Sequence, residues 1–220
     1  MTTRTFLALI GSPRAKSTSE TIARYLADGL AARGWTTEVR SLSAAIRHAE
    51  RWPDLEAAYQ RADVIGLCFP LYVDCLPAEM TEALERLAPI ARDTRPGCFA
   101  VCQCGFLEAE QNDTALAICR EFARDAGLDW LGGLAIGTGG ALNGGNWEKM
   151  GKMAAHITDG FAQTIEAIDA GAPIPDATQA LVRKRFCPTW MYWLIGNASM
   201  LTEARKHGAM WKITARPYAR

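Results

Sequence analysis

The sequence lacks several patterns that define common protein classes. Neither GxxxxGK[ST] nor GxGxxG occurs, which argues against a nucleoside triphosphatase loop and a dinucleotide fingerprint. No apolar run reaches the roughly 18 residues that suggest a transmembrane helix. The seven cysteines form no CxxC pair and no disulfide-like layout, and the N-terminus carries no signal-peptide pattern. We therefore expect a cytoplasmic protein without a metal site or a disulfide framework.

Net charge is also lacking, since 24 Lys and Arg residues balance 24 Asp and Glu residues. A nucleic-acid partner is therefore not favoured. The balance hides an asymmetry, because residues 1–172 hold 16 basic and 22 acidic residues, whereas residues 173–220 hold 8 and 2. We predict one domain over residues 1–172, followed over residues 173–220 by a linker and a basic, aromatic-rich helical tail.

The stretch from Phe6 to Leu30 is predicted to form a strand, a polar loop and a helix. Phe6–Ile10 is a short apolar run that stops at a glycine and a proline, as expected of a strand buried on both faces. Ser17 followed by Glu20 is a capping box, so the helix is predicted to begin there. The helix N-terminus therefore faces the loop.

This loop carries four hydroxyls and two cations: Ser12, Ser17, Thr18, Ser19, Arg14 and Lys16. The N–H groups at a helix N-terminus carry partial positive charge, and hydroxyls with a guanidinium can complete the coordination of a phosphate dianion. The pattern therefore favours phosphate binding. The alternative is an ordinary capped helix after a polar turn, which requires Ser17 alone.

Apolar runs alternate with amphipathic stretches along the rest of residues 1–172. Strands are predicted over residues 6–10, 36–40, 63–69, 98–103 and 130–136, and helices over 17–30, 53–61, 110–126 and 146–170, with another helix starting at Pro77. Strands that alternate with helices imply a parallel sheet. Right-handed crossovers then place helices on both faces and give an α/β three-layer sandwich.

Three loops in this order resemble those of a known family. G-S-P-R-x-x-S-T-S, residues 11–19, resembles the phosphate loop of flavodoxin-like NAD(P)H-dependent FMN reductases, and residues 69–85 resemble that family's second flavin loop. Residues 104–142 are similar as well, so the resemblance covers roughly residues 4–172. The first loop differs from the T-x-T-G-x-T loop usual in true flavodoxins, and the clustered cysteines of iron–sulfur flavoproteins are missing.

The resemblance implies a flavodoxin-like fold whose five-stranded parallel sheet has the order 2-1-3-4-5, with a C-terminal helical extension. Ligands of such sheets lie beyond the carboxyl ends of the strands at the switch point, here between the first and third strands. The implied cofactor is FMN, with NADH or NADPH as co-substrate. The residues that the resemblance implies for FMN binding are Ser12, Arg14, Ser17, Thr18, Ser19, Pro70, Leu71, Tyr72, Val73, Cys104, Gly105 and Phe106.

The implied activity is an oxidoreductase that moves hydride from NAD(P)H to the flavin and then to a small acceptor such as a quinone or free flavin. Because the flavin supplies the chemistry, no protein acid or base is required, and no catalytic residue is predicted. The alternative is a flavodoxin-like electron carrier without its own substrate turnover. Flavodoxins are typically strongly acidic, so zero net charge favours the enzyme. The acceptor and the choice between NADH and NADPH stay open.

The individual loops leave alternatives. Tyr72 is expected to stack on or edge the isoalloxazine ring, although burial for packing is the other interpretation. Backbone N–H groups over Cys104–Phe106 are expected to hold the flavin N1 and O2 edge, with a reactive Cys104 thiol as the less favoured alternative. Half of the residues from Gly132 to Gly145 are glycine, which permits a mobile loop beside the substrate or simply turns with positive φ.

The tail contains a predicted helix between Pro188 and Gly208. Its first half, residues 190–195, is apolar all round, and such a surface does not usually stay exposed to water. We expect the helix to dock on the domain or on a second subunit, giving a homo-oligomer such as a dimer. Peripheral membrane contact through its basic residues is the alternative.

Overall fold

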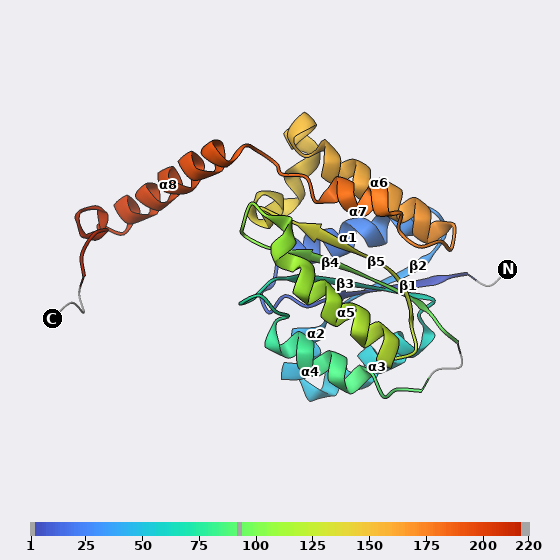
Figure 1. Ribbon diagram of the computed structural model, residues 1–220. Coiled ribbons are helices and arrows are strands. Elements are labelled where there is room, and N and C mark those ends of the chain that lie inside the picture. The colour runs from blue at the N-terminus through green and yellow to red at the C-terminus, as the bar shows by residue number, and fades with distance from the viewer. Residues whose placement is uncertain (1–2, 92–93, 217–220) are drawn as a thin grey trace. The chain divides into compact units, whose positions relative to one another are not determined.

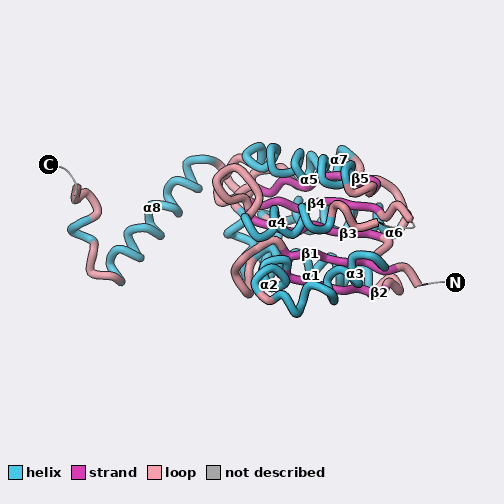
Figure 2. The backbone as a smooth tube through the Cα atoms, turned by 90° about the horizontal axis from the view of Figure 1, so that it is seen from below, coloured by secondary structure: helices cyan, strands magenta, loops and turns pink. Residues whose placement is uncertain are grey.

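Five parallel strands form one sheet in the order β2-β1-β3-β4-β5, which confirms the predicted order. The structure is a computed structural model that describes residues 3–91 and 94–216. Figure 2 shows the strands side by side in this order. Their bounds are Thr5–Ile10 for β1, Thr36–Ser41 for β2, Val64–Pro70 for β3, Gly97–Gln103 for β4 and Asp129–Ile136 for β5.

Strand burial follows the position of each strand in the sheet. Every residue of the apolar strand β3 is buried, whereas the edge strand β2 is partly exposed along its length. At the centre, the rings of Phe6 and Phe99 stack with centroids 5.9 Å apart. A Cβ atom at Gly66 would approach both rings to 2.9 Å, so glycine at this position leaves space for the stacked pair.

Helices cover both faces of the sheet, as predicted (Figure 1). One apolar cluster joins the sheet to α1 and α6, and another joins its opposite face to α2, α3, α4 and α5. The α-helices of this part of the chain are α1 Thr18–Ala31, α2 Leu42–Arg47, α3 Trp52–Arg61, α4 Ala78–Leu87, α5 Asp113–Asp125, α6 Ala155–Asp169 and α7 Asp176–Val182. Short 3₁₀ helices are η1 Ala49–Arg51 and η2 Ala109–Asn112, and a longer one is η3 Gly139–Met153.

Two helix predictions were wrong in their bounds, and two helices, α2 and α7, were missed. The predicted helix over residues 146–170 is a 3₁₀ helix up to Met153 followed by α6, because the glycine-rich stretch disfavours α-helix. The predicted helix over residues 110–126 begins at Asp113, after η2. Helix α2 was not predicted, although the Ser41 hydroxyl caps it by accepting the N–H of Ala44 at 3.2 Å.

The linker predicted at the start of residues 173–220 is part of the packed structure. Ile174 is buried, and its N–H donates to the Leu131 carbonyl at 2.7 Å. Helix α7 then packs next to β5, with the Gly133 N–H donating to the Gln179 amide oxygen at 3.3 Å. The compact unit consequently extends over residues 1–186, and residues 187–220 form a second unit.

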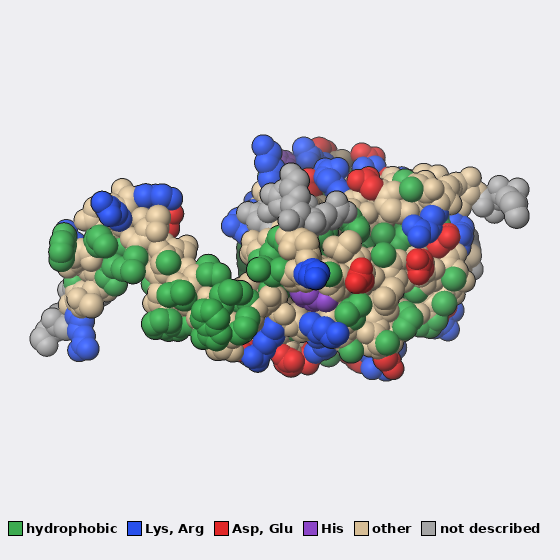
Figure 3. Space-filling view, turned by 90° about the horizontal axis from the view of Figure 1, so that it is seen from above, with side chains coloured by type: hydrophobic (Ala, Val, Ile, Leu, Met, Phe, Trp, Pro, Cys, Tyr) green, Lys and Arg blue, Asp and Glu red, His purple; other side chains and the backbone are tan. Residues whose placement is uncertain are grey.

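The second unit consists mainly of α8, Thr189–Lys206, and the short 3₁₀ helix η4, Met210–Lys212. The predicted helix is present, and Gly208 follows it with φ 64°, as is usual after a helix C-terminus. No residue of α8 is buried. Figure 3 shows hydrophobic side chains gathered on this unit. Across residues 3–91 and 94–216, no helix combines the length and apolarity needed to cross a bilayer.

Candidate functional site

The loop between β1 and α1 is fixed against the neighbouring strand. The Gly11 N–H donates to the Cys68 carbonyl at 2.9 Å, which continues the ladder between β1 and β3. A Cβ atom at Gly11 would lie 2.4 Å from Met80 Sδ and 2.7 Å from Phe69 Cβ. Glycine therefore lets the chain turn out of the sheet at the switch point between these two strands.

The capping box predicted at the start of α1 is present with a small change. Ser17 is the N-cap residue, and its Oγ accepts the Glu20 N–H at 3.2 Å. The Glu20 carboxylate accepts the N–H of Lys16 at 2.9 Å, which is one residue earlier than in the usual box. Hydrogen bonding from Arg24 lowers the pKa of Glu20, so the carboxylate stays charged. The first turn of α1 is therefore held in place.

Four hydroxyls surround this helix N-terminus, and all four residues are buried: Ser12, Ser17, Thr18 and Ser19. Ser12 Oγ accepts the Arg14 N–H at 3.3 Å, which curls the loop. The N–H groups of the first two helical residues have no intrahelical acceptor, and the Ser19 hydroxyl is buried without a hydrogen-bond partner. Arg14 is exposed beside them. The donor set fits a phosphate group, which accepts several hydrogen bonds at once.

The loop after β3 contains a tight turn. Its first residue, Leu71, donates its N–H to the Gln103 carbonyl at 2.8 Å, and Tyr72 and Cys75 exchange backbone hydrogen bonds of 2.9 and 3.0 Å. Between them, Val73 and Asp74 have φ of 49° and 57°. A β-branched residue in this region is strained, and Val73 is 98% exposed, so burial does not explain it. Tyr72 is 39% exposed, which excludes the alternative of full burial.

The loop after β4 is anchored by its backbone. The Cys104 N–H donates to the Ile136 carbonyl at 3.0 Å. The sequence predicted that this N–H would bind the flavin, but it already has an acceptor within the protein. Cys104 is 3% exposed, and burial raises the pKa of its thiol. A buried, protonated thiol is a poor nucleophile, which disfavours the reactive-cysteine alternative. The neighbouring Phe106, in contrast, presents a 56% exposed ring.

Asn112 holds this loop from inside. Its amide is fully buried, and Nδ2 donates to the carbonyls of Ala109 at 3.0 Å and Ile136 at 3.2 Å. Its Oδ1 accepts the Cys102 thiol at 3.1 Å. This role was not predicted, because the contact of Asn112 with Ile136 spans 24 residues and leaves no local signal in the sequence. Asn112 therefore positions the end of β4 against the end of β5.

The glycines after β5 allow close backbone contact with the same loop. The N–H of Thr138 donates to the Phe106 carbonyl at 2.5 Å, and that of Gly139 donates to the Cys104 carbonyl at 2.7 Å. A Cβ atom at Gly137 would meet the Leu107 carbonyl oxygen at 2.5 Å, and one at Gly139 would meet Gln103 Oε1 at 1.9 Å. Neither glycine has positive φ. Glycine is therefore needed at both positions because other atoms approach closely, and not because of turn geometry.

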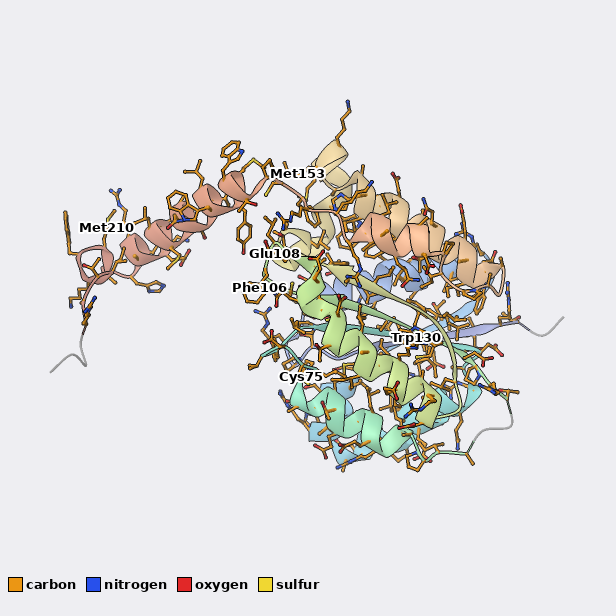
Figure 4. The ribbon with its side chains drawn as sticks, in the orientation of Figure 1. Cys75, Phe106, Glu108, Trp130, Met153 and Met210 are labelled. Atoms are coloured by element: carbon orange, nitrogen blue, oxygen red, sulfur yellow. The ribbon has the colours of Figure 1, made fainter. Side chains whose placement is uncertain are left out.

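The three predicted loops converge because the carboxyl ends of parallel strands share one edge of the sheet. Figure 4 shows Cys75 of the second loop and Phe106 of the third at the same end of the sheet. The edge thus combines a phosphate-type donor set with exposed aromatic rings at Tyr72 and Phe106. Within the described part of the chain, no group of His, Cys, Asp and Glu side chains could hold a metal ion. These features fit a nucleotide-like ligand with a flat ring.

Comparison with known proteins assigns this arrangement to a family. The family model described as NADPH-dependent FMN reductase matches residues 5–112, a stretch that contains the first two predicted loops and the start of the third. This stretch belongs to that family, which confirms the resemblance stated from the sequence. The chain is accordingly an NAD(P)H-dependent flavin oxidoreductase with FMN as its cofactor. No curated protein matches the chain significantly.

Solved structures support the fold. An NADH:FMN oxidoreductase in its apo form shares 15% identity and a TM-score of 0.57, covering 84% of this chain and 97% of that one. An FMN-dependent NADH-azoreductase from Bacillus anthracis, in complex with FMN, shares 10% identity and a TM-score of 0.53, covering 76% and 99%. An NAD(P)H:quinone oxidoreductase from Methanothermobacter marburgensis shares 17% identity and a TM-score of 0.51, covering 62% and 85%. At these identities the likeness concerns the fold alone.

Proposed function

We propose that the chain takes hydride from NADH or NADPH onto FMN and passes the electrons to a small acceptor such as a quinone or free flavin. The observation that carries the proposal is the loop of buried hydroxyls at the N-terminus of α1, placed at the switch point of a flavodoxin-like sheet. Structural neighbours named as quinone reductases and azoreductases are consistent with a small acceptor.

The residues of the chain have binding roles in this proposal. Ser12, Ser17 and the N–H groups at the start of α1 hold the phosphate, with Arg14 adding charge. Bound FMN supplies the redox chemistry, since it accepts a hydride and releases electrons to an acceptor. The exposed ring of Tyr72 borders the isoalloxazine system, and Phe106 lies at the neighbouring loop.

The β4 loop has a more restricted role than the sequence predicted. The Cys104 N–H and the carbonyls of Cys104 and Phe106 are engaged by residues at or beyond the end of β5. The loop is therefore preorganised, and we assign Cys104 a structural role in shaping the flavin pocket. We also propose a location in a reducing cytoplasm, since the spacing of the seven cysteines shows no disulfide-like layout.

The test is anaerobic reduction of the FMN-loaded protein by NADH and by NADPH, followed by stopped-flow mixing with a quinone or with free flavin. We expect bleaching of the flavin absorbance by at least one nicotinamide, and rapid recovery with an acceptor. The same experiment on Tyr72→Ala should show a changed reduction rate. Protein that binds FMN but is reduced by neither nicotinamide would contradict the enzyme and favour an electron carrier.

A further inference from the structure

A cleft lies beside the phosphate loop, next to β2. Its volume is about 350 Å³, and its walls come from the loop after β1, from α1, from β2 and from α2. We call it the basic cleft; its polar lining includes Arg14, Arg24, Arg47, His48, Ser41 and Ser43. Ser17, Thr18 and Ser19, which surround the start of α1, are not part of the lining. The volume lies within the range of small-molecule sites.

Arginines from three separate elements line the basic cleft, against one lining carboxylate, Glu20. Arg24 donates its Nε and Nη2 to Glu20 at 3.0 and 2.8 Å, and Arg47 pairs with Glu79 on α4, outside the lining. A guanidinium has five N–H donors, so both arginines keep donors after these contacts. The ion pairs hold the guanidiniums in place while the positive charge of the cleft exceeds its negative charge. An anionic group is therefore favoured there.

Apolar and hydroxyl groups complete the cleft. Ile10, Val39 and Ala44 contribute an apolar surface beside the arginines. Ser41 Oγ already accepts the Ala44 N–H, which leaves its own O–H to donate to a ligand. An apolar surface next to several cationic donors suits a molecule with a flat base and one or more phosphates, whereas a bare anion would use only the arginines.

We propose that the basic cleft binds the adenosine phosphate part of a dinucleotide. The cleft shares Ser12 and Arg14 with the phosphate loop, so one molecule or two neighbouring ones can present phosphates to both sides of that loop. Two sources have this chemistry: the adenosine diphosphate part of a flavin dinucleotide, and the 2′-phosphorylated adenosine of NADPH. The inference rests on the proposed function only in assigning the FMN phosphate to Ser17, Thr18 and Ser19 at the start of α1.

The test is isothermal titration of the full-length, FMN-loaded protein with ADP and with 2′,5′-ADP. We expect one-to-one binding of at least one of them. Tighter binding of ADP would identify the flavin dinucleotide as the source, and tighter binding of 2′,5′-ADP would identify NADPH. Arg24→Gln and Arg47→Gln should each weaken binding about tenfold or more, because each removes a charge-assisted contact.

Arg86→Gln is the matched control, because Arg86 pairs with Glu82 four residues away on α4, as Arg24 pairs with Glu20 on α1. It should bind like the parent. The side chains of Arg24 and Arg47 are 61% and 53% exposed, so their substitution leaves the core intact. Binding of neither nucleotide, unchanged affinity in both variants, or binding only to FMN-free protein would overturn the proposal. The last result would assign the cleft to the FMN phosphate itself, whereas failure of FMN to bind would concern the proposed function alone.

Discussion

The two units of the chain place their aromatic side chains in opposite environments. In residues 1–186, Tyr59 and Trp147 are at most 1% exposed and lie in packed clusters. In residues 187–220, Trp190, Trp193 and Trp211 are 67%, 66% and 95% exposed. Because buried apolar surface is the main source of folding free energy, the first unit is stabilised by its own core. The second unit instead exposes apolar side chains that can contact a binding partner.

The two units also differ in the sign of their net charge. Residues 1–186 contain 19 basic and 23 acidic residues, and residues 187–220 contain 5 and 1. A basic, aromatic segment and an acidic domain attract each other at short range, although salt screens this attraction within about 8 to 10 Å. We keep the expectation that α8 docks on a domain surface or a second subunit, with an anionic membrane as the alternative.

Truncation should give the largest effect and test where the first unit ends. A chain of residues 1–186 should keep the thermal stability of the domain, whereas a chain of residues 1–172 loses α7 and the buried Ile174, Val182 and Phe186. Burial of each such side chain contributes about 1.5–3 kcal/mol, so the shorter chain should unfold or aggregate. Melting curves from circular dichroism measure the difference. Equal melting temperatures for the two truncated chains would show that α7 is not part of the folded domain.

Sedimentation of the same proteins tests the role of the second unit. If α8 docks on another subunit, full-length protein should sediment as a dimer and residues 1–186 as a monomer that still binds FMN. Pelleting of only the full-length chain with anionic liposomes, in a salt-sensitive manner, would favour the membrane. A truncated chain that remains a dimer would disprove docking through α8.

A smaller effect is expected inside the first unit, where the glycine-rich stretch meets the β4 loop. Gly137→Ala should lower the free energy of unfolding by about 1–3 kcal/mol, because the new Cβ would press on the backbone carbonyl of Leu107, which cannot rotate away. Gly140→Ala is the control, since nothing lies within 4 Å of a Cβ there. Urea unfolding of both variants decides the matter. Equal stabilities would mean that the contact is not needed.

The smallest change in stability should come from the helix caps. Ser17→Ala and Ser41→Ala each remove a hydroxyl that accepts a first-turn N–H at 3.2 Å, so each should cost about 1 kcal/mol. Only Ser17→Ala should also weaken FMN binding, since Ser41 lies at the end of β2. Fluorescence titration with FMN measures this. Equal FMN affinities in the two variants would reduce Ser17 to a helix cap.

Local chemistry explains which parts of the structure could be predicted. The buried run Phe6–Ile10 and the Ser17 cap act within a few residues, so the sequence alone locates β1 and α1. The order of the strands came from the family resemblance, and the sheet confirms it. The placement of the phosphate loop at the switch point follows from that order.

Long-range contacts explain the rest. Ile174 and α7 looked like a linker because prolines and a glycine surround them, yet Leu131 and Gly133 of β5 supply hydrogen-bond partners more than 40 residues away. Gly137 and Gly139 were attributed to a mobile loop or to turns with positive φ, but a Cβ atom at either position would meet Leu107 or Gln103. Neither contact leaves a periodic pattern in the sequence, so neither could be predicted.

In the proposed function, FMN binds through its phosphate at the N-terminus of α1. The direct measurement is titration of flavin-free protein with FMN and with riboflavin, which differ only in that phosphate. Because each charge-assisted hydrogen bond contributes about 1.5–3 kcal/mol, FMN should bind at least about tenfold more tightly. Equal affinities for the two flavins would contradict the claim.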